Sequence, residues 1–196
     1  MDQQIRLEVI IGSVREGRVG SAVASWFAER AREQKEFDVG LLDLADHELS
    51  DRLSANPPRA TREALAEITP RLAAADAFVV VTPEYNHSYP AALKTAIDWH
   101  HEEWQGKPVG LVSYGGLSGG LRAAEHLRQV FAELSATTVR NTVSFHRSSA
   151  RDHGPWDDFG DAGDQDAATA ARVLLDELGW WALALRDARA ARPYPA

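Results

Sequence analysis

The sequence contains no cysteine. This excludes disulfides, thiolate nucleophiles and metal or iron–sulfur centres held by sulfur ligands. Long hydrophobic runs are missing too, because no stretch approaches the roughly 18 apolar residues that a membrane span needs. The first residues lead into an apolar segment interrupted by Arg6 and Glu8, without the basic and hydrophobic regions of a signal peptide. We therefore expect a soluble cytoplasmic protein with no membrane partner.

Basic side chains are in the minority: the sequence has 21 Lys and Arg but 29 Asp and Glu, which gives a formal net charge of -8. A surface of this sign repels nucleic-acid phosphates, so no nucleic-acid partner is expected. A local basic loop can still bind one small anion. The length of 196 residues and the hydrophobic content of 44% fit a single domain over residues 1–196, with residues 147–196 forming a polar loop and a carboxy-terminal helix.

The hydrophobic pattern alternates between strands and helices. Strands are predicted over residues 5–11, 37–44, 77–82, 109–114 and 138–145, and helices over 21–34, 61–75, 90–104 and 121–135. A last helix places Leu174, Leu178, Trp181 and Leu185 on one face, with Trp180 and Trp181 as packing residues and residues 186–192 as a frayed end. This alternation predicts an α/β fold with a five-stranded parallel sheet covered by helices on both faces.

Three unusual loops follow predicted strands, and ligands of open parallel sheets bind outside the carboxyl ends of the strands. The first loop supplies hydroxyl groups, guanidinium groups and glycines, namely Ser13, Arg15, Arg18, Gly20 and Ser21. It precedes a helix whose amino terminus favours an anion. The dinucleotide and nucleoside-triphosphate fingerprints are absent, so a monophosphate such as that of FMN fits best. The alternative is a solubilising loop in which Ser21 is an ordinary N-cap.

The second and third loops suit a flat ring. The second contains Pro83, Glu84, Tyr85 and Asn86, which combine stiffness, a flat surface and amide donors. The third begins with Ser113, Tyr114, Gly115 and Gly116 and can present backbone N–H groups while leaving one face open. The alternatives are a simple turn at Asn86 and a plain flexible connection after residue 114. No metal site is predicted, because His87 is isolated and the adjacent His100 and His101 point to different sides of a helix.

With these motifs, residues 5–146 resemble the NADPH-dependent FMN reductase family, which includes quinone, azo-dye and chromate reductases. The resemblance implies a flavodoxin-like fold. It implies that Ser13, Arg15 and Ser21 bind the FMN phosphate, that residues 83–86 border the ribityl chain and the isoalloxazine, and that residues 113–116 follow the other ring edge. Ala22, Val23 and Ala24 stand where many members have asparagine, so Arg18 is the candidate for the missing phosphate donor.

The expected function is that of an oxidoreductase that passes hydride from NADPH or NADH through FMN to free flavin, a quinone or another small acceptor. The flavin carries this chemistry, so no residue is assigned as catalytic nucleophile or general base. The alternative is a flavodoxin-type electron carrier without a substrate of its own. The glycine-rich third loop leaves an open face and therefore favours the enzyme.

The helix predicted over residues 90–104 has more apolar surface than one core contact requires. Leu93, Ile97 and Trp104 form one stripe, and Trp99 lies on another side. We therefore expect a homodimer or homotetramer built on this helix and on the one over residues 121–135, as the family resemblance also implies. In the alternative, Trp99 and Trp104 pack under the polar segment that follows residue 147.

Overall fold

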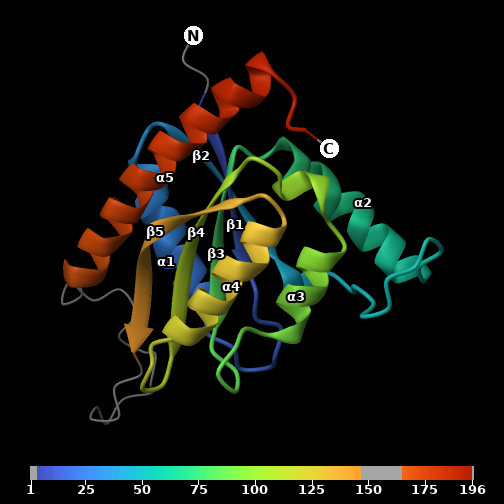
Figure 1. Ribbon diagram of the computed structural model, residues 1–196. Helices are drawn as coiled ribbons and strands as arrows, with labels where there is room; N and C mark the ends of the chain where they lie inside the picture. Colours follow the sequence, from blue (N-terminus) through green and yellow to red (C-terminus); the bar gives the residue numbers. More distant parts are fainter. Residues whose placement is uncertain (1–3, 147–164, 196) are drawn as a thin grey trace.

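The computed structural model describes residues 4–146 and 165–195, so the polar loop expected over residues 147–164 lies outside the described residues. Its five parallel strands follow the order β2-β1-β3-β4-β5. The strands are β1 (Ile5–Ile11), β2 (Phe37–Asp43), β3 (Ala77–Pro83), β4 (Pro108–Gly115) and β5 (Thr137–His146). The helices are α1 (Gly20–Glu33), α2 (Arg59–Ala74), α3 (Ala91–Asp98), α4 (Leu121–Glu133) and α5 (Gln165–Ala191). The predicted α/β fold with a five-stranded parallel sheet is confirmed (Figure 1).

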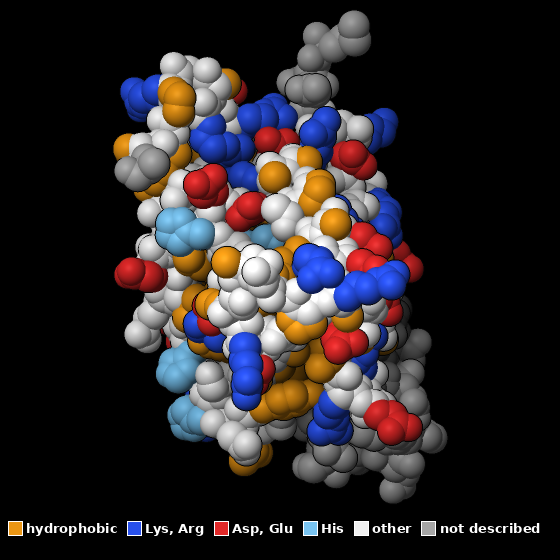
Figure 2. Space-filling model, turned by 90° about the vertical axis from the view of Figure 1, so that its right-hand side faces the viewer, with side chains coloured by type: hydrophobic (Ala, Val, Ile, Leu, Met, Phe, Trp, Pro, Cys, Tyr) orange, Lys and Arg blue, Asp and Glu red, His pale blue; other side chains and the backbone are white. Residues whose placement is uncertain are grey.

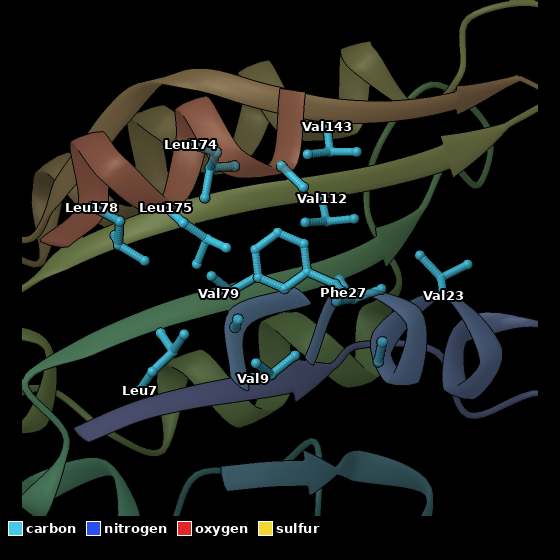
Figure 3. Packing of buried hydrophobic residues seen from close by; sticks show 14 of the residues in the cluster. Leu7, Val9, Val23, Phe27, Val79, Val112, Val143, Leu174, Leu175 and Leu178 are labelled. Atoms are coloured by element: carbon cyan, nitrogen blue, oxygen red, sulfur yellow. The ribbon is translucent and has the colours of Figure 1, made fainter. Parts of the chain in front are cut away.

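Successive strand residues point to opposite faces of the sheet, so each strand contributes side chains to two separate cores. On β3, Val79 and Val81 pack with α1 and α5, whereas Phe78 and Val80 pack with α2, α3 and α4. Figure 1 shows these two helix layers on either side of the sheet. Figure 3 shows the first core, in which Phe27 of α1 lies against Val79 beneath the leucines of α5. Burial on both faces explains why the central strand is a continuous apolar run.

The helix expected over residues 90–104 is shorter than predicted. It ends at Asp98, and residues 102–104 form a separate 3-10 turn. The physical reason is Trp104, whose indole N–H donates to the carbonyl oxygens of His100 (3.0 Å) and Ile97 (3.3 Å) and turns the chain inward. Trp104 is only 2% exposed and stacks edge-on against Phe78 and Phe131. Trp104, which the sequence placed on one stripe with Leu93 and Ile97, therefore packs in the second core.

Two expectations for the last helix are also wrong. Residues 186–191 are not frayed, because Arg186 and Arg189 lie 3.6 and 3.5 Å from the carboxylate of Asp76 and hold the end of α5 against the sheet. Trp180 is 65% exposed, whereas Trp181 packs partly buried against the first core. Adjacent residues of a helix are turned by about 100°, so only one of the pair can face the sheet.

Within the described part of the chain, no helix combines the length and hydrophobicity needed to cross a bilayer.

A bulge in β5 is enclosed by side chains from the two helix layers. Val109 and Leu111 of β4 pair with Thr138 and Thr142, so the intervening β5 residues lose their ladder partners. The carboxylate of Glu177 on α5 accepts the backbone N–H groups of residues 140 and 141, each at 3.0 Å. Arg128 of α4 donates to the carbonyl oxygens of residues 139 and 140. These side chains satisfy the backbone groups that the bulge leaves unpaired.

Replacing Glu177 with alanine is expected to lower the free energy of unfolding by about 1.5–3 kcal/mol, the scale of hydrogen bonds to a charged group. Partial burial acts to raise the pKa of Glu177, but the N–H groups of Asn141 and Arg140 outweigh it and lower the pKa. The stabilisation is therefore complete above the unfolded pKa of about 4.3 and is lost as the pH falls through the lower folded pKa.

Urea unfolding of wild type and variant at several pH values measures this difference. Asp176→Ala is the matched control, since its carboxylate is 58% exposed and forms only a 3.6 Å surface pair with Arg172. An equal loss for Asp176→Ala, or a Glu177→Ala difference that does not shrink in acid, would contradict the role of Glu177 at the bulge.

Candidate functional site

The three loops singled out in the sequence meet at one edge of the sheet. They follow β1, β3 and β4, whose carboxyl ends lie together because the strands are parallel. Between them lies a cavity of about 230 Å³. It is lined by Arg15, Gly17, Arg18, Val19, Pro83, Glu84, Tyr85, Tyr114, Gly115 and Gly116. The chain order reverses between β1 and β3, and this switch point is where sheets of this kind bind their ligands.

The start of α1 is packed closely against two hydroxyl groups. A Cβ atom on Gly20 would lie 2.2 Å from Ser13 Oγ and 2.8 Å from the Tyr114 hydroxyl oxygen, so only glycine fits there. Ser13 is fully buried. Burial raises the pKa of Tyr114 to about 12, against the lowering effect of the Ser13 hydroxyl. The Tyr114 phenol therefore keeps its proton at physiological pH and remains a neutral group beside the first loop.

The two arginines of the first loop differ in their surroundings. Arg18 is largely buried, and its Nη2 donates to a carboxylate oxygen of Asp43 at 2.6 Å. Its other terminal nitrogen, Nη1, is buried and has no hydrogen-bond partner among the described residues. Arg15 is exposed, with its guanidinium carbon 6.0 Å from the centre of the Tyr85 ring. Arg18 thus lines the cavity and has one charged nitrogen that no hydrogen bond among the described residues satisfies.

Ser21 is an exposed residue within the first turn of α1, not its N-cap. The N-cap is Val19, which has no side-chain oxygen and forms no capping hydrogen bond. The alternative interpretation, in which Ser21 is the N-cap of the helix, is therefore wrong. The first N–H groups of α1, which have no acceptor within the helix, remain at the cavity edge together with the positive end of the helix dipole.

The second loop is a two-residue hairpin turn. Tyr85 and Ser88 exchange backbone hydrogen bonds of 2.8 and 3.1 Å, with Asn86 and His87 between them at φ values of 49° and 76°. Left-handed backbone at two successive positions is typical of tight hairpins, and asparagine tolerates it better than most residues. Asn86 forms the turn, is exposed and does not line the cavity.

Glu84 lines the cavity, and its carboxylate is bonded to groups at the start of α4. It accepts hydrogen bonds from the Ser118 hydroxyl (2.6 Å), the Arg122 backbone N–H (3.2 Å) and the Arg122 guanidinium (2.8 Å). Burial acts to raise the pKa of Glu84, but the hydrogen bonds from Ser118 and Arg122 and the Arg122 charge outweigh it and lower the pKa. Glu84 is therefore a carboxylate at neutral pH, and it connects the second loop to the third.

The structure thus brings eight of the predicted site residues to the cavity wall. These are Arg15, Arg18, Pro83, Glu84, Tyr85, Tyr114, Gly115 and Gly116. Of the others, Ser13, Gly20 and Ser113 lie buried behind the wall, and Ser21 and Asn86 are exposed nearby. Sequence reasoning missed Gly17 and Val19, although both belong to the first loop.

Sequence reasoning also missed three residues that hold the site from outside: Asp43, Ser118 and Arg122. The signal for Asp43 was its place at the end of β2, on the same sheet edge as the loops. Among residues 4–146 and 165–195, no group of three or more histidine, aspartate and glutamate side chains is placed to hold a metal ion.

The strand order and the cavity at the switch point together define a flavodoxin-like fold, in which ligands bind at this position of the sheet. The family model for NADPH-dependent FMN reductase matches residues 5–150, so the chain belongs to this family. Membership confirms the expectation of an FMN-containing, NAD(P)H-dependent oxidoreductase.

Individual relatives agree with this assignment. An NAD(P)H-dependent FMN reductase of Schizosaccharomyces pombe is 41% identical over 120 residues, which span 59% of this chain and 60% of the relative. A quinone reductase of Escherichia coli is 37% identical over 146 residues, covering 71% and 76% of the two chains. The solved structure of a flavoenzyme NAD(P)H:(acceptor) oxidoreductase from Paracoccus denitrificans has a TM-score of 0.65 at 24% identity, covering 92% of this chain and 98% of that chain. This last likeness concerns the fold.

Proposed function

We propose that the cavity binds FMN, with its phosphate at the first loop and its ring between the second and third loops. The phosphate would contact Arg15, Arg18 and the first N–H groups of α1, with Ser13, Gly20 and Ser21 shaping that end. The ring would lie against Pro83, Glu84, Tyr85 and Asn86 on one side and Ser113, Tyr114, Gly115 and Gly116 on the other. The observation that carries this proposal is the buried Arg18 Nη1, which has no partner among the described residues.

A buried guanidinium N–H without an acceptor is expensive, whereas a phosphate oxygen at that point makes a strong charge-assisted hydrogen bond. Asp43 neutralises the other arm of Arg18, Arg18 lines the cavity, and Nη1 has no hydrogen-bond partner among the described residues. The residues present therefore fit a monophosphate, which needs few donors at a helix amino terminus.

When bound, FMN supplies the hydride-accepting and hydride-donating chemistry of the reaction. The chain's part is to bind, orient and leave one ring face accessible. Tyr114, with its pKa of about 12, stays neutral and adds no negative charge beside the phosphate loop. Gly116 leaves open space where a side chain would stand, because a Cβ atom there would meet nothing within 4 Å. We assign no residue as acid, base or nucleophile.

We propose that NADPH or NADH is the hydride donor and that free flavin, a quinone or another small molecule is the acceptor. Steady-state oxidation of each nucleotide by the FMN-loaded protein, with and without added flavin or quinone, tests this. Acceptor-dependent turnover supports the enzyme. A protein that binds FMN but oxidises neither nucleotide would instead favour the flavodoxin-type electron carrier.

Replacing Arg15 with alanine is expected to weaken FMN binding by about 1.5–3 kcal/mol, the scale of a hydrogen bond to a charged group. Titration of the apoprotein with FMN, followed by flavin fluorescence, measures the change. Arg59→Ala is the control, because Arg59 forms an exposed ion pair with Glu63 on α2 and lies outside the cavity wall. Unchanged affinity in Arg15→Ala would assign the phosphate contact to Arg18 instead.

We further propose a homodimer or homotetramer in which α3 and α4 face a second subunit. Trp99 supports this less than its sequence position suggested, because it is half-buried and its indole N–H donates to the Ser50 carbonyl at 2.8 Å. The better support is Leu117 and Leu121, which are exposed next to the cavity. The face over α2 and α3 mixes basic, acidic and hydrophobic side chains (Figure 2), without a field of one sign to oppose association. Light scattering at micromolar concentration tests the assembly.

The single-domain organisation over residues 1–196 and the cytoplasmic location also remain proposals. Support for the first comes from α5, whose leucines complete the first core although the family match ends at residue 150. Support for the second is the absence of cysteine, which fits a compartment where disulfides do not form. Single-transition unfolding and cell fractionation, respectively, test them.

A further inference from the structure

The glycine-rich third loop is held in place more firmly than its composition suggests. Four glycines at positions 115, 116, 119 and 120 give a chain with large conformational freedom. Near its end the carbonyl oxygen of Gly119 accepts hydrogen bonds from two hydroxyl groups, of Ser113 at 2.9 Å and of Ser144 at 2.8 Å. Beside it, the carboxylate of Glu84 accepts the Ser118 hydroxyl, the Arg122 backbone N–H and the Arg122 guanidinium.

The backbone of Glu84 is held by the sheet, so its side chain can restrain this loop. It directly follows β3, and its own backbone N–H donates to the Tyr114 carbonyl at 3.1 Å, which continues the pairing of β3 with β4. Its side chain is only 8% exposed, whereas that of Arg122 is 49% exposed. Arg122 lies in the first turn of α4, where the helix dipole favours a carboxylate. An ion pair whose carboxylate is shielded and fully hydrogen-bonded stabilises the structure more than an ion pair between two exposed side chains does.

We propose that Glu84 is a positioning residue, and that the Glu84 latch, formed by Glu84, Ser118 and Arg122, holds the third loop in the conformation that receives FMN. The inference rests on the proposed FMN site. Gly115 and Gly116 line the cavity and belong to the same loop that the latch restrains. A loop ordered before binding does not have to be ordered by the ligand, and apparent affinity falls in proportion to the fraction of protein in the competent conformation.

The test compares Glu84→Ala, Ser118→Ala and Glu84→Gln in the full-length protein. Hydrogen exchange of the apoprotein reports on the loop directly, because the Arg122 amide is bonded to Glu84 and the Leu121 amide to Ser118. In Glu84→Ala these amides should exchange faster, and FMN affinity should fall about 10- to 100-fold, the scale of charged hydrogen bonds. Glu84→Gln keeps an acceptor oxygen and should restore part of both readouts.

A positioning role also predicts the kinetic pattern. At saturating FMN, Ser118→Ala should recover the turnover of the wild type, because Ser118 lies outside the cavity wall and only the fraction of competent loop has changed. The control is Glu125→Gln, which removes a 68% exposed carboxylate from the same helix. It should leave loop exchange and FMN affinity unchanged.

Unaltered exchange at residues 118–122 in both Glu84→Ala and Ser118→Ala would overturn the latch, whatever their affinity for FMN. So would a loss of affinity that Glu125→Gln shares, or a turnover of Ser118→Ala that saturating FMN does not restore. A wild-type protein that ignores FMN would contradict the proposed function instead, and the exchange of the apoprotein would still test the restraint of the loop.

Discussion

Replacing Trp104 with alanine is expected to lower the free energy of unfolding by about 3–5 kcal/mol, the usual cost of truncating a buried tryptophan. The side chain is 2% exposed, and its ring lies 4.7 Å from that of Phe78 and 5.4 Å from that of Phe131, measured between centroids. The variant also loses the indole N–H that satisfies the carbonyl oxygens of His100 and Ile97 at the end of α3. It therefore combines a large cavity with unsatisfied backbone groups.

Urea unfolding followed by circular dichroism measures the loss, and the chain supplies a matched control. Trp180→Ala makes the same substitution at a residue that is 65% exposed, so its effect should stay near the small range of surface changes, within about 0.5–1 kcal/mol. Similar losses in both variants would contradict the placement of Trp104 in the core. A Trp104→Ala variant that keeps its stability but dissociates into monomers would instead place Trp104 at a subunit interface.

Replacing Gly20 with valine is expected to reduce FMN affinity by at least about 100-fold and stability by about 1–3 kcal/mol, the scale of overpacking in a dense interior. The new Cβ would stand 2.2 Å from Ser13 Oγ, 2.8 Å from the Tyr114 hydroxyl oxygen and 3.2 Å from the Ile11 side chain. The start of α1 must therefore move away from β1 and β4. Its free N–H groups then no longer converge on the site proposed for the phosphate.

Ala22→Val is the matched control, because Ala22 lies in the same helical turn but is exposed. FMN titration and urea unfolding of both variants separate a local collision from a general effect of valine on the helix. Affinity retained in Gly20→Val would mean that the start of α1 does not contribute to the phosphate site. Equal losses in the two variants would attribute the effect to helix propensity instead.

The strands were predictable because each carries its own signal. Ala77–Pro83 reads as buried on both faces without any knowledge of the neighbours, and the predicted strand limits agree with the structure to within about two residues. Errors appeared where a side chain makes a distant contact. The end of α3 depends on Trp104 returning to the core, and the order of residues 186–191 depends on Asp76, more than a hundred residues away in the sequence.

The candidate site divides in the same way. The three loops were predictable from composition, because glycine, proline, hydroxyl and guanidinium groups directly after strands are local properties of the chain. The parallel sheet then places the three loops at one edge. Side-chain direction is not local. Glu84 was assigned to the cofactor with its neighbours, yet its carboxylate turns to Ser118 and Arg122, and Arg18 shares its charge with Asp43.

The sequence by itself therefore determined the α/β fold, the family and the edge of the sheet at which a ligand binds, since periodicity and loop chemistry depend on neighbouring residues alone. The tertiary structure decided which polar groups satisfy one another and which remain available. Buried donors and acceptors take whichever partner the packing brings within hydrogen-bond distance, and for Glu84, Asp43 and Glu177 that partner lies in another element of the chain.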